Sequence, residues 1–336
     1  MRDPRVGRRP VAGGLLAVTD GSGHGPRRVL VLRALGLGDF LTGVPAYRAL
    51  RQAFPEHCLT LAAPAVFADL VPLTDAVDEV SPAYGLAPLQ WSGPPPDVAV
   101  NLHGRGPRSH RLLQALQPRR TITYYAPEVP GLSGPCWRAD EHEVNRWCRL
   151  LDSGGIPADP SRLELRPPAV RSPAPGAVVV HPGAAAGSRR WPPDRFAAVV
   201  AQLRCCGHRV ALTGSAAELP LCQDVAERAG VGSAAVLAGS LRLNELAALV
   251  ADAALLVCGD TGVAHLATAY ATPSVVLFGP VAPAWWGPPP GRDQHVALWR
   301  EVDRDRPADP HADHLDPALA LISVEDVLAA ARSILG

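Results

Sequence analysis

The sequence contains no lysine, so every basic side chain apart from histidine is an arginine. Any cationic contact to a phosphate must therefore come from arginine or histidine. The formal net charge is zero, which argues against a general polyanion binder, and we expect no nucleic-acid partner. There is also no run of about 18 apolar residues, so no transmembrane helix is predicted.

Cysteine is present but not in a functional pattern. The seven cysteines are scattered, odd in number and without CxxC spacing, which excludes a disulfide framework and a cysteine zinc site as leading interpretations. Reduced thiols in a cytoplasmic protein are expected instead. Residues 1–26 are basic and Gly-rich, with an apolar stretch too short for a signal peptide, and are predicted to be a flexible extension.

Strands alternate with helices twice along the chain, and the Pro-rich segment 166–176 separates the two series. This pattern predicts an α/β protein with two Rossmann-like parallel-sheet domains facing a central cleft. The predicted domains are residues 27–165 and 177–322, followed by a C-terminal helix over 323–336 that Ser323 caps. Ligands bind outside the carboxyl ends of strands in such sheets, so the cleft is the expected site.

Local patterns also predict individual elements. A helix is expected over residues 40–53, another over 65–71, and a short strand over 236–237. Asp194 is expected to cap the helix that follows it, and residues 281–313 are expected to be loop-rich.

The strongest local unit lies at residues 253–280, where an apolar strand, a Gly-rich turn, a helix and a second strand follow one another. The turn Gly259-Asp260-Thr261-Gly262 precedes helix amides that have no intrahelical partner, so it predicts a phosphate site. The alternative is that Asp260 or Thr261 merely caps the helix. His265, one turn inside the helix, could reach the phosphate or make a structural hydrogen bond.

A second Gly-rich turn, Gly36-Leu37-Gly38-Asp39, follows the first strand. The dinucleotide fingerprint GxGxxG fails because Leu41 stands at the third glycine, which removes the main support for hydride transfer. Asp39 would lie at a helix N-terminus, where a carboxylate stays ionised and could act as a general base. The alternative interpretation is an ordinary helix cap.

Further candidates lie on loops after other strands. Arg189 and Arg190 could neutralise a diphosphate, or could be solvated loop arginines. Glu218 could accept hydrogen bonds from a ribose, or could be a surface charge. Gly38, in the turn after the first strand, and His103 and Arg105, which end another strand of the first domain, are weaker candidates for the acceptor side. The spacing of residues 311–316 mimics metal ligands, but its polar, Pro-flanked loop argues against a metal site.

Four segments together resemble glycosyltransferase family 9, the heptosyltransferase type: RVLVLRALGLGDFLTGVPAYRAL, VVVHPGAAAGSRRWPPDRFAAVVAQL, VALTGSAAE and LAALVADAALLVCGDTGVAHLATAYATPSVVLFGP. The resemblance implies a GT-B fold that binds the acceptor mainly in the first domain and the sugar nucleotide mainly in the second. It implies that Asp39 is the catalytic base, that Asp260, Thr261 and Gly262 contact the donor, and that Glu218 lies near the ribose. The family usually has lysine where Arg189 or Arg190 stands near the phosphates, so this chain departs there.

The resemblance implies an inverting, metal-independent transfer of a sugar from a nucleotide-diphosphate sugar to a cell-envelope or other glycan, with no cofactor. ADP-heptose is the best-known donor of the family. A lipid-linked acceptor would bring this cytoplasmic protein to the inner face of the membrane as a peripheral contact. Two alternatives remain: a nucleotide-sugar epimerase of the same architecture, and a non-catalytic nucleotide-sugar binder. Product analysis would reveal an epimerase, because it converts the nucleotide sugar without any acceptor. A non-catalytic binder would show no downstream change when Asp39 is mutated.

Overall fold

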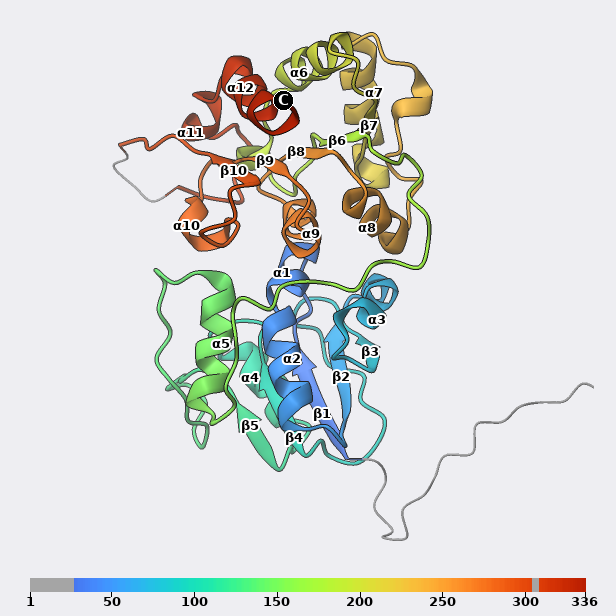
Figure 1. Ribbon diagram of the computed structural model, residues 1–336. Coiled ribbons are helices and arrows are strands. Elements are labelled where there is room, and N and C mark those ends of the chain that lie inside the picture. Colours follow the sequence, from blue (N-terminus) through green and yellow to red (C-terminus); the bar gives the residue numbers. More distant parts are fainter. Residues whose placement is uncertain (1–26, 304–307) are drawn as a thin grey trace, which may run out of the picture.

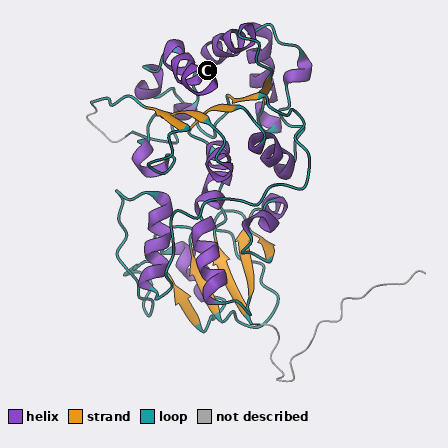
Figure 2. Cartoon of the chain, in the orientation of Figure 1, coloured by secondary structure: helices purple, strands orange, loops and turns teal. Residues whose placement is uncertain are grey.

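The computed structural model describes residues 27–303 and 308–336. The predicted extension at residues 1–26 lies outside the described part of the chain. Two α/β domains are stacked one above the other, each a sheet flanked by helices (Figures 1 and 2). The chain crosses from the first to the second through the segment predicted as a linker (Figure 1). In the described residues no helix is both long and apolar enough to cross a membrane.

The first sheet has the strand order β3-β2-β1-β4-β5, and all its pairs are parallel. Its strands are β1 (Arg28–Leu32), β2 (Cys58–Ala63), β3 (Glu79–Pro82), β4 (Val98–Asn101) and β5 (Arg120–Ile122). The central strands β1 and β4 are nearly continuous apolar runs because both faces of the sheet are covered.

The second sheet has the order β10-β9-β8-β6-β7 and is also parallel throughout. Its strands are β6 (Val178–His181), β7 (Val210–Leu212), β8 (Leu255–Gly259), β9 (Ser274–Leu277) and β10 (His295–Leu298). Val236 forms an isolated parallel bridge with Leu212 beyond β7. If the bridge at Val236 is counted as a strand and the strands are numbered from β6 as strand 1, the sheet has the doubly wound order 3-2-1-4-5-6. The predicted fold class, two Rossmann-like parallel-sheet domains, is confirmed.

Helices cover both faces of each sheet. The first domain contains α1 (Leu37–Thr42), α2 (Val44–Ala53), α3 (Val71–Thr74), α4 (Arg108–Gln114), α5 (Glu143–Ser153) and the 3-10 turn η1 (Ala65–Asp69). The second contains α6 (Pro193–Cys205), α7 (Leu219–Arg228), α8 (Leu243–Ala251), α9 (Gly262–Tyr270), α10 (Pro283–Trp286), α11 (Pro317–Ala320), α12 (Val324–Leu335), η2 (Gly187–Arg189), η3 (Ala216–Glu218) and η4 (Ser233–Ala235). The predicted C-terminal helix, α12, packs with α6 on one face of the second sheet, while α8 and α9 lie on the other (Figure 1). The hydroxyl of Ser323 caps α12 as predicted.

Several local predictions were wrong in detail. The helix expected over 40–53 is broken at Gly43, where a Cβ atom would lie 2.5 Å from the Tyr47 hydroxyl oxygen. The helix expected over 65–71 is the turn η1 followed by α3, and the strand expected over 236–237 is a single bridge. Asp194 stands inside the first turn of α6 rather than at its cap, because Pro192 and Pro193 already set the helix start. The loop-rich segment 281–313 contains α10 and β10.

The two domains share a continuous core. One cluster of buried apolar side chains contains Val31 of β1, Leu41 of α1, Val263 and Leu266 of α9, and Leu256 of β8. The contact between α1 and α9 therefore joins the two sheets at the place where both present the carboxyl ends of their strands. This contact positions the site described next.

Candidate active site

A cavity of about 740 Å³ lies between the two domains. The loop after β1 forms its wall in the first domain, and the loops after β6, β7 and β8 form its wall in the second. The lining includes Leu35 to Asp39, His181, Ala185, Arg189, Thr213 to Ser215, Glu218, Leu241, Leu243, Leu246, Asp260 to Val263, His265, Val281, Trp286, Pro310 and His311. In each sheet the strand order reverses beside β1 or β6, which is where ligands bind in doubly wound folds.

The turn after β8 places the amino end of α9 in this cavity. Thr261 occupies the cap position in extended conformation, but its side chain makes no capping hydrogen bond. The capping role considered for Thr261 is therefore not observed, and Gly262 and Val263, the first residues of α9, line the cavity without a capping acceptor from Thr261. Such amides, with the positive end of the helix dipole, favour a bound anion.

Asp260 lies beside this turn and is almost fully buried. Burial raises the pKa of its carboxyl to about 6, although the Arg189 guanidinium opposes that rise. The nearest nitrogen of Arg189 is 3.9 Å from Asp260 Oδ2, and the buried Nε of Arg189 has no hydrogen-bond partner. Arg189 therefore keeps hydrogen-bonding capacity for a further acceptor. Arg190, the second predicted arginine, is exposed outside the cavity wall and donates through Nε to the carbonyl of Ala184 at 2.8 Å.

Glu218 forms another part of the wall. Its Oε2 accepts hydrogen bonds from the amide and the hydroxyl of Ser215, at 2.7 and 2.9 Å. Burial raises the pKa of Glu218, but these hydrogen bonds and the charges of His181 and Arg190 outweigh burial and lower it below its ordinary value. The carboxylate lies over Gly183, where a Cβ atom would be 2.1 Å from Oε1. Gly183 thus makes room for an ionised acceptor at the cavity edge.

Asp39 comes from the opposite domain. It is the third residue of α1, and its Oδ2 accepts a hydrogen bond from the amide of Gly36 at 3.2 Å. The Asp39 side chain therefore caps the start of α1 through Oδ2 only. The second oxygen lies 3.6 Å from the Arg33 guanidinium, and a quarter of the side chain is exposed. Burial raises the pKa of Asp39, Arg33 lowers it and Glu143 raises it. A carboxylate so placed keeps some base strength and remains accessible from the cavity.

Gly38 of α1 and His265 of α9 lie against each other in the lining of the cavity. A Cβ atom on Gly38 would lie 3.0 Å from Cδ2 of the His265 ring. The ring also lies edge-on to Trp286, with 6.0 Å between centroids. Burial lowers the pKa of His265 to about 4, with a smaller contribution in the same direction from His142. His265 is therefore neutral at physiological pH and lies at the contact between the domains.

Of the three weaker candidates, Gly38 lines the cavity, whereas His103 and Arg105 do not. His103 Nδ1 accepts a hydrogen bond from the amide of Ala34 at 3.2 Å, so His103 supports the loop that carries Asp39. Burial lowers the pKa of His103 to about 4, which keeps this acceptor nitrogen unprotonated. Arg105 is exposed at the carboxyl end of β4, beyond His103.

Sequence reasoning missed several residues of the wall. Three leucines, Leu241, Leu243 and Leu246, contribute apolar surface to the cavity, and Trp286 and His311 also line it. The leucines had no signal of their own because apolar residues at a helix start usually belong to a core. His311 had been considered only as part of a metal-like spacing. Among the described residues, no three His, Cys, Asp or Glu side chains are grouped closely enough to hold a metal ion.

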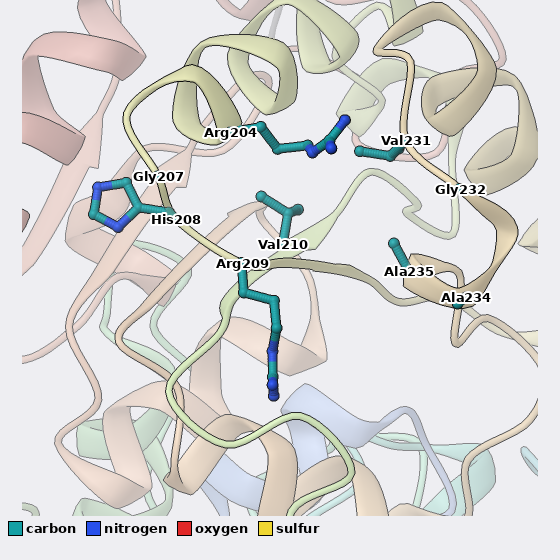
Figure 3. A pocket seen from close by; sticks show the side chains of 9 residues that line it. All are labelled: Arg204, Gly207, His208, Arg209, Val210, Val231, Gly232, Ala234 and Ala235. Atoms are coloured by element: carbon teal, nitrogen blue, oxygen red, sulfur yellow. The ribbon is translucent and has the colours of Figure 1, made fainter.

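A second depression, of about 490 Å³, lies on the far side of the second domain near the start of β7. Arg204, His208 and Arg209 line it, but their side chains point in different directions (Figure 3). Arg204 donates to the carbonyl of Gly230, and Arg209 donates to that of Pro175. These side chains do not converge on a common point, and the depression is at the amino end of the sheet. The cleft between the domains is therefore the better candidate site.

Comparison with known proteins identifies the family to which this chain is similar. The sequence profile of glycosyltransferase family 9 (heptosyltransferase) matches residues 138–309, just over half of the chain. The chain belongs to glycosyltransferase family 9. The resemblance predicted from the four sequence segments is thereby confirmed.

The individual relatives share low sequence identity with this chain. Lipopolysaccharide heptosyltransferase 3 of Escherichia coli K12 is 26% identical over 227 residues, which cover 67% of this chain and 58% of that protein. The chain thus spans little more than half the length of this curated relative. Two solved structures are similar, a family 9 glycosyl transferase from Veillonella parvula and ADP-heptose lps heptosyltransferase II from E. coli. Both have a TM-score of 0.72 and 20% identity, cover 92% of this chain, and are themselves covered to 97% and 98%. At that identity they establish the shared fold.

Proposed function

We propose that this protein is an inverting, metal-independent glycosyltransferase that moves a sugar from a nucleotide-diphosphate sugar to a glycan of the cell envelope. In this proposal the domain at residues 27–165 binds the acceptor, and the domain at residues 177–322 binds the donor. The protein would work in the cytoplasm and would touch the inner face of the membrane when its acceptor is lipid-linked.

The observation that carries the proposal is the set of residues that line one cavity. Asp39 comes from the first domain, while Arg189, Glu218 and the turn Asp260 to Gly262 come from the second, and all of them line the same cavity. A base and an anion site on opposite walls is the arrangement that a single displacement between two substrates needs.

In the proposed step, the Asp39 carboxylate takes the proton of an acceptor hydroxyl. The acceptor oxygen forms a bond to the anomeric carbon from the face opposite the nucleotide. The bond from that carbon to the phosphate oxygen breaks, and its electron pair leaves with the nucleoside diphosphate. One displacement from the opposite face inverts the anomeric configuration.

The leaving diphosphate gains negative charge during this step. The amino end of α9 beside Thr261 and the guanidinium of Arg189, which line the same cavity, are available to stabilise that charge. A guanidinium offers two phosphate oxygens a rigid, planar pair of N–H donors, whereas the lysine usual in this family offers a compact point charge on a flexible stem. These groups form the phosphate end of the proposed donor site.

The rest of the cavity fits a nucleoside. Glu218, held by Ser215, offers an ionised acceptor for ribose hydroxyls. The leucines Leu241, Leu243 and Leu246 offer an apolar surface for a base. The solved relative from E. coli is described as an ADP-heptose lps heptosyltransferase. We therefore propose ADP-heptose as the first donor to test.

The test combines binding and transfer. A nucleotide that binds the folded protein at about 100 times its dissociation constant should stabilise it by about 2.7 kcal/mol, which a thermal shift against nucleoside diphosphates and their sugars would detect. Transfer is then measured by mass spectrometry with the bound donor and a heptose-deficient inner-core oligosaccharide, and NMR gives the anomeric configuration of the product. A product with inverted configuration, lost in Asp39→Asn, supports the proposal. Conversion of the donor without acceptor would identify an epimerase, and donor binding without any turnover would identify a binding protein.

A further inference from the structure

A buried network of charges lies behind Asp39 and comes from two distant parts of the chain. Arg33, at the end of β1, is fully buried. Its guanidinium donates to the carbonyls of Asp39 and Leu102 and, through Nη2, to the Thr42 hydroxyl at 2.9 Å. It also lies over the Trp147 ring, 4.8 Å from the centroid. Arg33 is therefore fixed at the back of the loop that carries Asp39.

Two carboxylates compete for the same nitrogen of Arg33. Nη2 donates to Glu143 Oε1 at 3.2 Å, whereas Asp39 Oδ1 is 3.6 Å away. Glu143 is the first residue of α5 and is itself held by two other donors. The Trp147 indole nitrogen donates to Oε1 at 2.8 Å, and Arg146 donates to Oε2. Glu143 therefore satisfies Arg33 without requiring a close ion pair with Asp39.

This arrangement matters because a buried cation without a partner is costly, and it binds the nearest anion. If Glu143 were neutral, Asp39 would be the nearest carboxylate able to balance Arg33. Asp39 would then be drawn into an ion pair with Arg33 and would be a weaker base. We propose that Glu143 is a positioning residue for transfer, which holds Arg33 and thereby leaves Asp39 free to take the acceptor proton. This proposal rests on the proposed function.

Other titratable groups also face Asp39. Tyr47 of α2 is fully buried near it, and the Asp39 charge adds to the burial that raises the pKa of this phenol. His265 of α9 lines the same cavity as Asp39 and has a pKa of about 4, and His142, which precedes α5, contributes to that lowering through its charge. Tyr47 and His265 are uncharged near neutral pH. The charges that bear most directly on Asp39 there are those of Arg33 and Glu143, and both contribute to its pKa with opposite signs.

The test compares Glu143→Gln with Glu141→Gln. Glu141 lies two residues earlier and pairs with Arg149 at 2.7 Å through both oxygens, but it does not contact Arg33. We expect Glu143→Gln to lower kcat by about 10-fold or more, to move the acidic limb of the kcat profile to lower pH, and to leave the dissociation constant of ADP within about twofold. Glu141→Gln should keep the wild-type pH profile.

Two further variants separate positioning from folding. Glu143→Asp retains the charge and should recover part of the turnover and of the pH profile, even where Glu143→Gln folds poorly. In an Arg33→Gln background, adding Glu143→Gln should move the acidic limb less than it does in the wild-type background, because only the direct charge effect of Glu143 on Asp39 remains. A Glu143→Gln protein with the wild-type pH limb and turnover overturns the inference. Absence of transfer by the wild-type protein with every donor would instead count against the proposed function.

Discussion

Gly38 and Gly262 lie against each other across the cleft, and a Cβ atom on Gly262 would be 2.9 Å from the Gly38 amide nitrogen and 2.7 Å from Leu37 Cβ. Neither glycine has positive φ, so the requirement at Gly262 is for space rather than for an unusual backbone conformation. The start of α1 and the start of α9 can approach only because neither carries a side chain at this point.

Gly262→Ala is expected to push the two helices apart by a few tenths of an ångström or more. Because Asp39 lies on α1 and the phosphate amides lie on α9, turnover should fall by about 10-fold to 100-fold. Steady-state transfer assays would measure this. Gly232→Ala is the matched control, since a Cβ atom there meets nothing within 4 Å. Equal turnover in the two variants would show that the glycine contact does not set the geometry of the site.

Arg189→Met is expected to weaken ADP binding by about 10-fold to 100-fold, because a charge-assisted hydrogen bond to phosphate contributes roughly 1.5 to 3 kcal/mol. Arg190→Met should change the dissociation constant by less than about threefold, since Arg190 lies outside the cavity wall. Isothermal titration calorimetry with ADP measures both. A larger loss in Arg190→Met would reverse the assignment of the two arginines.

Asp260→Asn tests the effect of burial on the site. The folded carboxyl holds its proton up to about pH 6, whereas the unfolded one holds it only to about 3.8, so the folded protein binds more protons between these values. Stability from this group therefore rises as pH falls through that window, and above pH 6 the buried carboxylate costs up to about 3 kcal/mol. Asp260→Asn should be more stable than wild type at pH 8, and the difference should shrink toward pH 4.

Asp326→Asn is the control for that measurement, because its expected effect on stability at pH 8 is opposite to that of Asp260→Asn. Hydrogen bonds from Ser323 and the charge of Arg300 lower the pKa of Asp326. Its stabilising contribution is present above the unfolded pKa and is lost as the pH falls through the folded one, so this variant should be less stable at pH 8. Urea unfolding followed at several pH values gives both differences. A stability difference for Asp260→Asn that does not vary with pH would contradict the buried-carboxylate account.

Arg48→Met is expected to destabilise the first domain by about 2 to 4 kcal/mol. Arg48 is buried in α2 and donates to the carbonyls of Thr74, Arg162 and Glu164, at 3.1, 3.0 and 2.7 Å. It thereby ties the chain before the linker to the first domain. Arg162→Met removes an exposed arginine whose nitrogen is 3.8 Å from Glu164, and it should change stability by less than about 0.5 kcal/mol. Comparable losses in the two variants, measured by urea unfolding, would argue against this role of Arg48.

Much of the fold could be predicted because its signals are local. Apolar strands followed by Gly-rich turns mark the carboxyl ends of β1 and β8, and those turns carry Asp39 and Asp260. Most of what was not predicted depends on packing between distant segments. The first helix is a local exception. It breaks at Gly43 because Pro45, in the first turn of α2, has no amide hydrogen to donate to the preceding turn. β10 is a four-residue strand that exists only through pairing with β9.

The same reason limits what sequence could say about the site. Arg189 and Glu218 follow strands and could be proposed from their loops. The contact of Glu143 with Arg33 joins residues 110 positions apart, and no local pattern indicates it. The choice between Arg189 and Arg190 depends on which side chain turns toward Asp260, which the backbone of η2 decides.

The linker crosses between the domains along one side of the molecule, and α12 returns to the second sheet rather than to the first (Figure 1). Each wall of the cavity therefore belongs to a sheet whose strand pairing is complete without the other. A rotation about residues 166–176 would change the width of the cavity and the spacing of Asp39 from Asp260 without breaking a strand-to-strand hydrogen bond. Opening the cavity for a bulky glycan would leave both sheets intact, but it would separate α1 from α9 within the shared core and break the ion pair between Arg242 and Asp69.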